Sequence, residues 1–278
     1  MTDRLTMLCV HAHPDDESST TGGILRTYAD QGVRTVLVTC TDGALGDAPD
    51  GTTPEADHHD PSSVAEHRAE ELERAAAILG IARVEMLGYP DSGMEGWAQN
   101  DASGSFWSTP VDEAAARLLP ILLEERPQVV VTYDEIGFYG HPDHIQAHRV
   151  TRAALDASGL TASLFYPAIP RSAFGRFRAA LREAEIEPPG GAEDDAGENQ
   201  GPPGTPDDEI GVVVDVSSAV DAKFDALAAH ASQTESSFFL KMGRERFREF
   251  FGTEWFVRAV DPLGRSGVDH DLFAGWRD

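Results

Sequence analysis

The sequence predicts an α/β fold in which helices flank a mostly parallel sheet, with a small C-terminal α/β addition. Apolar runs of strand length alternate along the chain with longer segments whose apolar residues recur at helical spacing, which is the pattern of repeated βαβ units. The strand-like runs are almost continuously apolar, as expected of parallel strands that helices cover on both faces. With 278 residues and 41% hydrophobic content, the chain can bury a large core.

The N-terminal segment predicts the first βαβ unit. An apolar run at 6–10 is typical of a buried strand, and residues 21–30 place their apolar side chains on one face of a helix. Gly32 follows this helix in the position of a C-cap. A second apolar run at 35–40 then predicts the neighbouring parallel strand.

A longer helix is expected at 62–79, followed by a strand at 84–87. Val64 and Leu72 lie on one apolar stripe of this helix, and Arg68 falls on the same stripe. A charge on an apolar stripe has two explanations. The guanidinium of Arg68 is either snorkelling or paired with an acid, or it lies near a bound ligand, and the pattern favours neither.

The next segment repeats the alternation of helix and strand. A helix is expected at 111–125 and a strand at 128–132. Pro142 suits the first turn of a further helix at 142–157, because its missing N–H has no partner there in any case. A short apolar run at 164–166 predicts the following strand.

The chain divides into a core at 1–182, an acidic segment at 183–209 and a C-terminal part at 210–278 that completes the same domain. The acidic segment is rich in Glu, Asp, Pro and Gly and has almost no apolar content, so a disordered loop is expected there. The C-terminal elements are expected as strands at 211–216 and 255–260 and as helices at 218–231 and 245–251.

Composition argues against several classes of partner. The formal net charge is −26, whereas nucleic acids and anionic membranes bind basic surfaces. No apolar stretch is long enough to span a bilayer, and the first residues lack the regions of a signal peptide. We therefore expect a cytoplasmic protein with a small-molecule partner, as a monomer or a homo-oligomer. Cys9 and Cys40 lie in apolar runs and are predicted to be core residues rather than a disulfide.

Two clusters of histidine and carboxylate follow predicted strands. Residues 11–17 read His-Ala-His-Pro-Asp-Asp-Glu directly after the first strand, and residues 141–144 read His-Pro-Asp-His shortly after the fourth. Because ligands bind beyond the carboxyl ends of parallel strands, the two clusters are expected to meet at one edge of the sheet. Imidazole and carboxylate are ligands of catalytic zinc, where three protein groups leave one position for water.

The spacing within the first cluster predicts different roles for its two adjacent aspartates. His13 and Asp16 lie three residues apart, on one side of a turn, so both can reach one ion. Asp15 then points elsewhere and is left as a general base beside a water whose pKa zinc lowers toward about 7. Glu17 either supports these groups or acts as an acid near the positive end of a helix.

The second cluster can complete the site. His144 is the candidate third ligand, and His148, one helical turn later, is a rival ligand. His141 is then left to polarise a substrate carbonyl or to protonate a leaving amine. Asp143 can orient a histidine through its second ring nitrogen, and Tyr139 can donate to a developing oxyanion.

The other motifs give little evidence of function. The first βα turn lacks the Gly-x-Gly-x-x-Gly pattern, and Gly22-Gly23 comes late and after acidic residues, so pyrophosphate binding is not predicted. No Gly-x-Ser-x-Gly elbow is present. Of the other histidines, His11 is expected to be structural, His58 and His59 in the polar loop are expected to be solvated, and His230 and His270, which have no partner cluster, are expected to be structural.

The motifs resemble the LmbE-like (PIG-L) family of zinc-dependent de-N-acetylases and, within it, the mycothiol-pathway deacetylases of N-acetylglucosaminyl-inositol. The resemblance covers most of residues 5–157 and, more loosely, 223–233. Besides the two clusters, it is carried by Thr-Asp-Gly at 41–43, Arg-Ala-Glu-Glu-Leu at 68–72 and Gly-Tyr-Pro-Asp-Ser-Gly-Met at 88–94. It implies a Rossmann-like parallel sheet and a hydrolase that acts on N-acyl amino sugars.

The resemblance also implies roles for individual residues. Zinc is the implied metal, and the same ligands suit Fe²⁺. The implied metal ligands are His13, Asp16 and His144; the implied catalytic groups are Asp15 as general base and His141, with Tyr139, as the group that stabilises charge or supplies a proton; the implied substrate-binding residues are Arg68, Asp91 and Met94.

Three functions follow from these patterns. The first is removal of an N-acetyl group from an N-acetylglucosamine-type substrate, which releases acetate and a free amine. The second is amidase action on mycothiol S-conjugates, with the same chemistry and a larger acyl group. The third is a non-catalytic, metal-dependent ligand-binding protein, which needs neither Asp15 nor His141. The chain departs from the mycothiol enzymes at 18–20 and 44–47, where the substrate is read.

Overall fold

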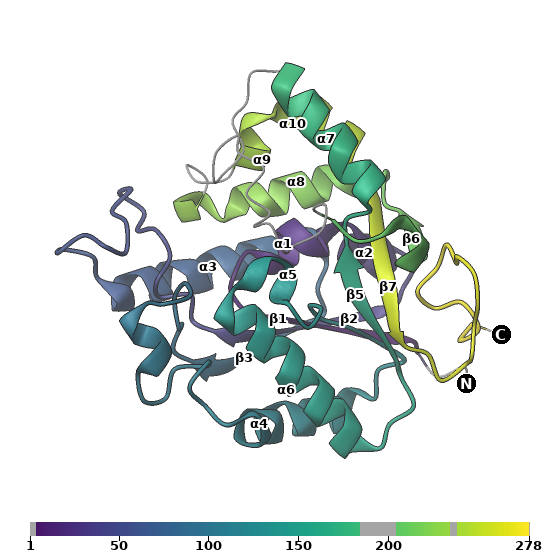
Figure 1. Cartoon of the computed structure of the whole chain (residues 1–278), viewed down its shortest axis with the longest axis horizontal. Helices are drawn as coiled ribbons and strands as arrows, with labels where there is room; N and C mark the ends of the chain where they lie inside the picture. The colour runs from purple at the N-terminus through teal and green to yellow at the C-terminus, as the bar shows by residue number, and fades with distance from the viewer. Residues whose placement is uncertain (1–3, 184–203, 234–237, 278) are drawn as a thin grey trace.

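A seven-stranded sheet with the order β3-β2-β1-β4-β5-β7-β6 forms the centre of the protein (Figure 1). The computed structural model describes residues 4–183, 204–233 and 238–277. Strands β1 to β5 are parallel, and β7 runs antiparallel to both β5 and β6. The predicted α/β fold with a mostly parallel sheet is confirmed. The strands are β1 (Thr6–His11), β2 (Arg34–Thr41), β3 (Arg83–Tyr89), β4 (Val129–Val131), β5 (Ser163–Ala168), β6 (Ile210–Asp215) and β7 (Thr253–Val260).

Helices cover both faces of this sheet. Figure 1 shows α4 and α6 on one side and α2, α3 and α8 on the other. Within the described residues, no helix combines the length and apolar character needed to cross a membrane. The helices are α1 (Asp16–Thr20), α2 (Gly22–Asp30), α3 (Pro61–Leu79), α4 (Val111–Glu125), α5 (Gly137–Gly140), α6 (Pro142–Ser158), α7 (Arg171–Glu183), α8 (Val220–Ala229), α9 (Phe238–Lys241) and α10 (Gly243–Phe251), with short 3₁₀ turns at Ala98–Asp101, Asp207–Glu209 and Ala231–Gln233.

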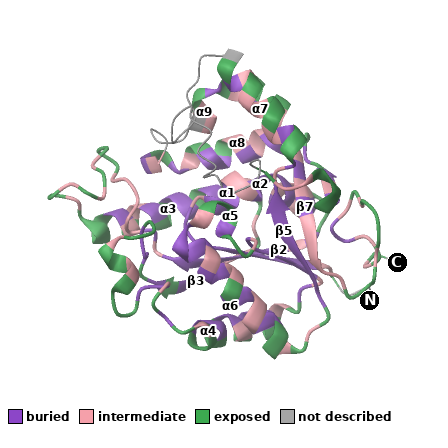
Figure 2. Ribbon diagram, in the orientation of Figure 1, coloured by how far each residue is buried: buried purple, intermediate pink, exposed green. Residues whose placement is uncertain are grey.

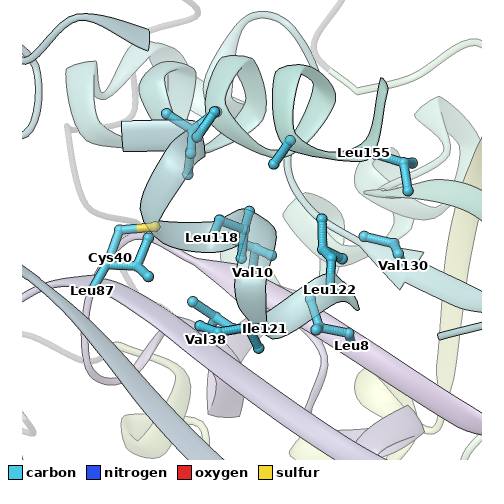
Figure 3. Packing of buried hydrophobic residues seen from close by; sticks show 14 of the residues in the cluster. Leu8, Val10, Val38, Cys40, Leu87, Leu118, Ile121, Leu122, Val130 and Leu155 are labelled. Atoms are coloured by element: carbon cyan, nitrogen blue, oxygen red, sulfur yellow. The ribbon is translucent and has the colours of Figure 1, made fainter. Parts of the chain in front are cut away.

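The central strand β1 contributes side chains to two separate apolar cores. Successive side chains of a strand point to opposite faces, so Leu8 and Val10 pack into one core while Met7 and Cys9 pack into the other. This double burial explains why the run is apolar at every position. Figure 2 shows that β2 and β5 are buried in the same way, whereas β7 is mostly of intermediate exposure. Figure 3 shows the first core, in which Leu8, Val10, Val38, Cys40 and Val130 of the sheet meet Leu118, Ile121 and Leu122 of α4 and Leu155 of α6.

The two cysteines are buried core residues, as predicted. Both are free thiols and fully buried. Cys9 belongs to the core beneath α2 and α3, whereas Cys40 belongs to the core beneath α4 and α6. The sheet therefore separates the two sulfur atoms.

The strand order determines where a ligand can bind. From β1 the chain moves outward through β2 to β3 and then returns to the other side of β1 as β4. Such a reversal leaves the carboxyl ends of two adjacent strands open at the edge of the sheet, which is where ligands bind in open α/β folds. The chain leaves β1 into α1 and leaves β4 into α5, and the two short helices lie close together at this edge (Figure 1).

The differences from the predicted elements lie mainly in the C-terminal half, although the short helices α1 and α5 were not predicted either. Strands β6 and β7 extend the main sheet instead of forming a separate layer. Helix α7 was not predicted, although Phe174, Phe177 and Leu181 recur at helical spacing in it. Residues 184–203 of the predicted acidic loop lie outside the described part. The prediction of disorder is wrong for residues 204–209, where Thr205 bridges to Pro170 and a 3₁₀ turn follows.

A carboxylate of the last strand binds the start of α2. Glu254 of β7 accepts hydrogen bonds from the backbone N–H groups of Gly23 and Ile24 at 2.9 and 3.0 Å, and Lys223 Nζ lies 2.6 Å from Glu254 Oε1. A Cβ atom on Gly23 would lie only 2.6 Å from Glu254 Oε1, which explains the glycine. A protein carboxylate thus occupies the amides that would otherwise suit a phosphate, in agreement with the prediction that this turn holds no pyrophosphate.

We expect Glu254→Ala to destabilise the protein strongly. The substitution leaves the Lys223 ammonium, whose side chain is 3% exposed, without its partner, and breaking a buried ion pair in this way costs about 3–5 kcal/mol. Urea unfolding followed by circular dichroism measures the loss. Lys223→Met is the matched control, because Glu254 keeps its two backbone donors in that variant and the loss is smaller. Equal stability of Glu254→Ala and the unsubstituted protein would contradict the interpretation.

Candidate metal centre and active site

The first motif makes a strained turn between β1 and α1. Asp15 adopts a φ of 112°, in the left-handed region that residues other than glycine rarely enter. The backbone N–H of His13 donates to Asp16 Oδ2 at 2.8 Å, and that of Asp15 donates to Glu17 Oε2 at 3.0 Å. The turn sends the two adjacent carboxylates in different directions, as the sequence predicted: Asp16 faces two histidines, and Asp15 faces Arg68.

The second motif begins the long helix α6. His141 is its N-cap, and Pro142 occupies the first helical position, as expected. The backbone N–H of Asp143 donates to His141 Nδ1 at 3.1 Å. His144 Nδ1 lies 3.2 Å from the carbonyl oxygen of Gly137. Because a carbonyl only accepts, His144 Nδ1 is the protonated nitrogen and its Nε2 carries the lone pair.

The two motifs meet around the carboxylate of Asp16. His13 Nδ1 lies 3.3 Å from Asp16 Oδ2, and His144 Nε2 lies 3.5 Å from Asp16 Oδ1. One ring nitrogen from each of His13, His141 and His144 lies within 4.8 Å of the others. All four side chains belong to buried residues. The structure therefore brings together the three predicted ligands and places His141 beside them.

This arrangement fits a metal ion on its own chemistry. His144 Nε2 is buried, has no hydrogen-bond partner and points its lone pair toward a carboxylate oxygen. In the neutral form His13 Nε2 donates to Asp143 Oδ2 at 3.3 Å, which leaves the Nδ1 lone pair facing Asp16 as well. Acceptors that face one another in a buried site need a cation between them. Two imidazole nitrogens and a carboxylate suit Zn²⁺ and also Fe²⁺.

The electrostatics of the site hold Asp16 and His144 in the forms that ligate metals. Although burial opposes the shift, His144 and His13 keep the pKa of Asp16 well below its usual value. Burial lowers the pKa of His144 to about 4, so that its imidazole is neutral. His13 carries the opposite tendency, since the carboxylates of Asp91, Asp143 and Asp16 overcome its burial and raise its pKa.

His141 is a neutral hydrogen-bond donor in this setting. Burial, together with the imidazoles of His13 and His144, lowers the pKa of His141 to about 3. Its Nδ1 accepts the backbone N–H of Asp143, so the single proton of the neutral ring sits on Nε2. Of the two roles that the sequence left open for His141, this geometry favours stabilisation of developing negative charge.

Arg68 lies against the candidate general base. Its Nη2 donates to Asp15 Oδ2 at 3.1 Å and to the carbonyl oxygen of Pro14, and its Nη1 donates to that of Gly43 at 2.7 Å. A Cβ atom on Gly43 would lie 2.5 Å from Arg68 Nη1, so this residue must be small. Burial raises the pKa of Asp15 to about 6, and the guanidinium opposes the shift. The apolar stripe thus admits Arg68 because its two terminal nitrogens donate to buried acceptors, although Nε has no partner among the described residues.

The remaining predicted residues line the same edge. Asp91 follows β3, where its Oδ1 lies 3.7 Å from His13 Nε2 and accepts the N–H of Gly93 at 2.8 Å. Asp143 orients His13, as its motif suggested. Met94, three residues after Asp91, is 44% exposed, and Tyr139 is 62% exposed. The Tyr139 ring centre lies 5.0 Å from that of His144.

Histidines outside the cluster make other contacts. His11 is structural and contacts Thr21 Oγ1 at 2.8 Å, and His148 lies outside the metal cluster with its Nδ1 2.9 Å from the carbonyl oxygen of Tyr133. His230 is buried and structural, as predicted, and its Nε2 lies 2.8 Å from Glu17 Oε1. No local signal could reveal this contact, since the two residues lie 213 positions apart.

Tyr133 is a further residue whose role the sequence did not reveal. Its ring stacks on His144 with a centroid distance of 4.1 Å and an interplanar angle of 17°. Its hydroxyl oxygen accepts the backbone N–H of Ala12 at 3.0 Å. Tyr133 therefore ties the first motif to the second. The apolar run that precedes it gave a signal for the strand but not for this contact.

A pocket of about 380 Å³ lies on the flank of the second motif, beside the residues that precede and follow His141. Its lining combines two tryptophans with two acids and contains no basic residue. Aromatic faces and carboxylates suit a neutral, hydroxyl-rich group better than an anion. The lining residues are Glu95, Gly96, Trp97, Asn100, Asp101, Trp107, Gly140, Pro142 and Ile145.

Solved structures with the same fold are mostly deacetylases. N,N'-diacetylchitobiose deacetylase from Pyrococcus horikoshii aligns with a TM-score of 0.57 and 19% identity, over 94% of this chain and 88% of that one. The zinc-inhibited form of teicoplanin deacetylase aligns with a TM-score of 0.55 and 21% identity, over 92% of this chain and 99% of that one. At such identities the likeness establishes the fold alone.

Sequence relatives are much closer. A protein of Acidothermus cellulolyticus named 1D-myo-inositol 2-acetamido-2-deoxy-alpha-D-glucopyranoside deacetylase is 42% identical over 282 residues, which cover 97% of this chain and 94% of the relative. A protein of Thermobifida fusca with the same name is 41% identical over 99% of this chain and 100% of the relative. The family model described as GlcNAc-PI de-N-acetylase matches residues 8–155. The chain belongs to this PIG-L de-N-acetylase family.

Proposed function

We propose that the protein is a metal-dependent N-deacetylase that hydrolyses the acetamide of N-acetylglucosamine linked to inositol, releasing acetate and a free amine. The observation that carries the proposal is the buried Asp16 carboxylate facing lone pairs of His13 and His144, with the separate carboxylate of Asp15 beside it. The names of the relatives support the same substrate.

The metal would be held by His13, Asp16 and His144. When bound, Zn²⁺ supplies a Lewis acid that polarises the acetamide carbonyl and acidifies water. The neighbouring carboxylate of Asp143 supports this role, because it holds the His13 ring through Nε2 and leaves Nδ1 directed at the site.

Asp15 is the proposed general base. Its side chain is 29% exposed, so it can reach solvent, while Arg68 holds one of its oxygens. Asp15 takes a proton from the attacking water and returns it to the departing amine. Arg68 keeps this carboxylate oriented throughout, which is a positioning role beside any contact with the sugar.

His141 and Tyr139 would stabilise the charge that develops on the carbonyl oxygen. The Nε2–H of His141 is a preorganised donor, because the backbone of Asp143 fixes its other nitrogen. The Tyr139 hydroxyl is a second donor at the rim. We assign Asp91, Met94 and Arg68 to the sugar side of the site, as the family resemblance implies.

A small molecule is the proposed partner, and the cytoplasm is the proposed location. The net charge of −26 disfavours nucleic acid and anionic membranes. The two buried, unpaired cysteines support a reducing compartment.

The protein loaded with zinc should release acetate and primary amine from N-acetylglucosaminyl-inositol faster than from N-acetylglucosamine, because the conjugate offers a second hydroxyl-rich ring to bind. Acetate and amine are quantified in parallel, with chelated and reloaded protein as control, and Fe²⁺-loaded protein tests the metal. Amine release only from a mycothiol S-conjugate would establish the amidase instead. No release from any of these substrates by metal-loaded protein would contradict the proposal.

His144→Ala and His141→Ala should separate metal binding from catalysis. Loss of the His144 ligand should weaken zinc binding by more than about 100-fold, since loss of even an outer partner costs about 10–100-fold. His141→Ala should keep its zinc while kcat falls by about 10²–10³-fold, as on removal of an oxyanion donor. Metal analysis after dialysis, with kcat on the same samples, gives both results. Loss of zinc from His141→Ala would make His141 a ligand.

Asp15→Asn should retain zinc and lose about 10²–10⁴-fold in kcat, because the amide cannot accept the proton. Initial rates of acetate release and metal content are the measurements. Asp57→Asn, which alters an exposed carboxylate in the polar loop, is the matched control and should leave kcat unchanged. Full activity of Asp15→Asn would remove the general base from the proposal and favour the ligand-binding alternative.

A further inference from the structure

The conformation of Asp15 requires a restraint. A residue other than glycine in the left-handed region costs about 1–3 kcal/mol and persists only where the surroundings hold it. Asp15, with a φ of 112°, has no side-chain capping bond to α1. The restraint on its backbone N–H is Glu17 Oε2, at 3.0 Å. Glu17 therefore helps to fix the backbone of Asp15, while Arg68 contacts its carboxylate.

Glu17 is fully buried and is itself held by a residue from the other end of the chain. Its Oε1 accepts from Ser18 Oγ at 2.5 Å and lies 2.8 Å from His230 Nε2. A carboxylate oxygen in this ion pair accepts, so His230 Nε2 is the donor. His230 is 1% exposed and its Nδ1 is buried without a hydrogen-bond partner. The contact with Glu17 is thus the polar interaction that fixes the imidazole.

The segment 230–233, which we call the strap, is fastened at two further points. The N–H and Oγ of Ser232 donate to the buried carboxylate of Glu71 on α3 at 2.6 and 2.7 Å. Gln233 Nε2 donates to the carbonyl oxygen of Asp47 at 2.8 Å, in the loop that follows β2. Figure 1 shows α1 beneath α8, the helix that leads into the strap. His230 is therefore held at a fixed place above the first motif.

We propose that His230 is a positioning residue for the general base, acting through Glu17 on the backbone of Asp15. The proposal rests on the proposed function in one respect, that Asp15 is the base. The strap lies outside residues 8–155, which the family model matches, so the C-terminal part of the chain would contribute to the catalytic turn. Removal of the His230 donor frees Glu17, and the Asp15 carboxylate then loses its alignment with the attacking water.

The first test compares His230→Phe with His230→Gln. Phenylalanine fills the space but cannot donate, whereas the glutamine amide can still donate to Glu17. We expect kcat to fall by about 10–100-fold in His230→Phe, since a small misplacement of a catalytic group costs up to about 10²-fold. KM and zinc content should stay unchanged, and His230→Gln should restore most of kcat. Unchanged kcat in folded, zinc-loaded His230→Phe would overturn the proposal.

A double-variant cycle distinguishes positioning from general stability. If His230 acts through Asp15, adding His230→Phe to Asp15→Asn should lower the residual kcat by less than about twofold, because residues that act as a unit are not additive. A full loss in both backgrounds would mean that His230 is merely structural. Should His230→Phe not fold, His230→Asn, whose amide stops short of Glu17, takes its place with the same expected results.

Hydrogen–deuterium exchange of the metal-free protein gives a readout that is independent of catalysis. The Asp15 amide donates to Glu17, so the peptide that contains residues 15–19 should exchange faster in His230→Phe than in His230→Gln. Equal exchange in the two variants would refute the link between His230 and the turn. If the unsubstituted protein releases no acetate, the proposed function fails, while the exchange experiment still decides whether His230 holds Asp15.

Discussion

The carboxylate of Asp16 between two imidazoles is the interaction on which the rest of the site depends. Each oxygen of this buried group faces a ring nitrogen, at 3.3 Å from His13 and 3.5 Å from His144. The protein fixes both rings from behind, through Asp143 on one and the carbonyl of Gly137 on the other. These backing contacts select the tautomers that turn lone pairs inward. The fold thus places the Asp16 carboxylate and the lone pairs of both rings where a bound cation stabilises them.

That geometry exists because β1 and β4 are neighbours. The clusters that follow them are 130 residues apart, as the contact between His13 and Asp143 illustrates, and only the reversal of strand order brings them together. Tyr133 strengthens the junction, since its ring stacks on His144 and its hydroxyl binds the backbone of Ala12. The parallel strands do not contribute catalytic groups themselves. They determine the places from which the turns start.

Periodicity in the sequence was sufficient for the strands and for the five helices α2, α3, α4, α6 and α8 that cover the sheet, and residue identity was sufficient for the two motifs. Each of these features depends on residues that are close together in the chain. Strands that are buried on both faces, for example, have apolar residues at almost every position. Arg68 could not be assigned from its stripe, because its acceptors come from Pro14, Asp15 and Gly43, far from it in sequence. The contact between His230 and Glu17 could not be predicted for the same physical reason.

The bond between the last strand and the first long helix has a consequence for how the chain folds. Glu254 lies 231 residues from Gly23, yet it satisfies the first amides of α2. Chains emerge from the ribosome with the N-terminus first, so this helix is synthesised long before the carboxylate that completes it. Contacts of such sequence separation form slowly, because a long loop must close before they stabilise anything. The start of α2, which lies close to the turn that holds Asp15 and Asp16, is therefore completed only after β7 has been synthesised.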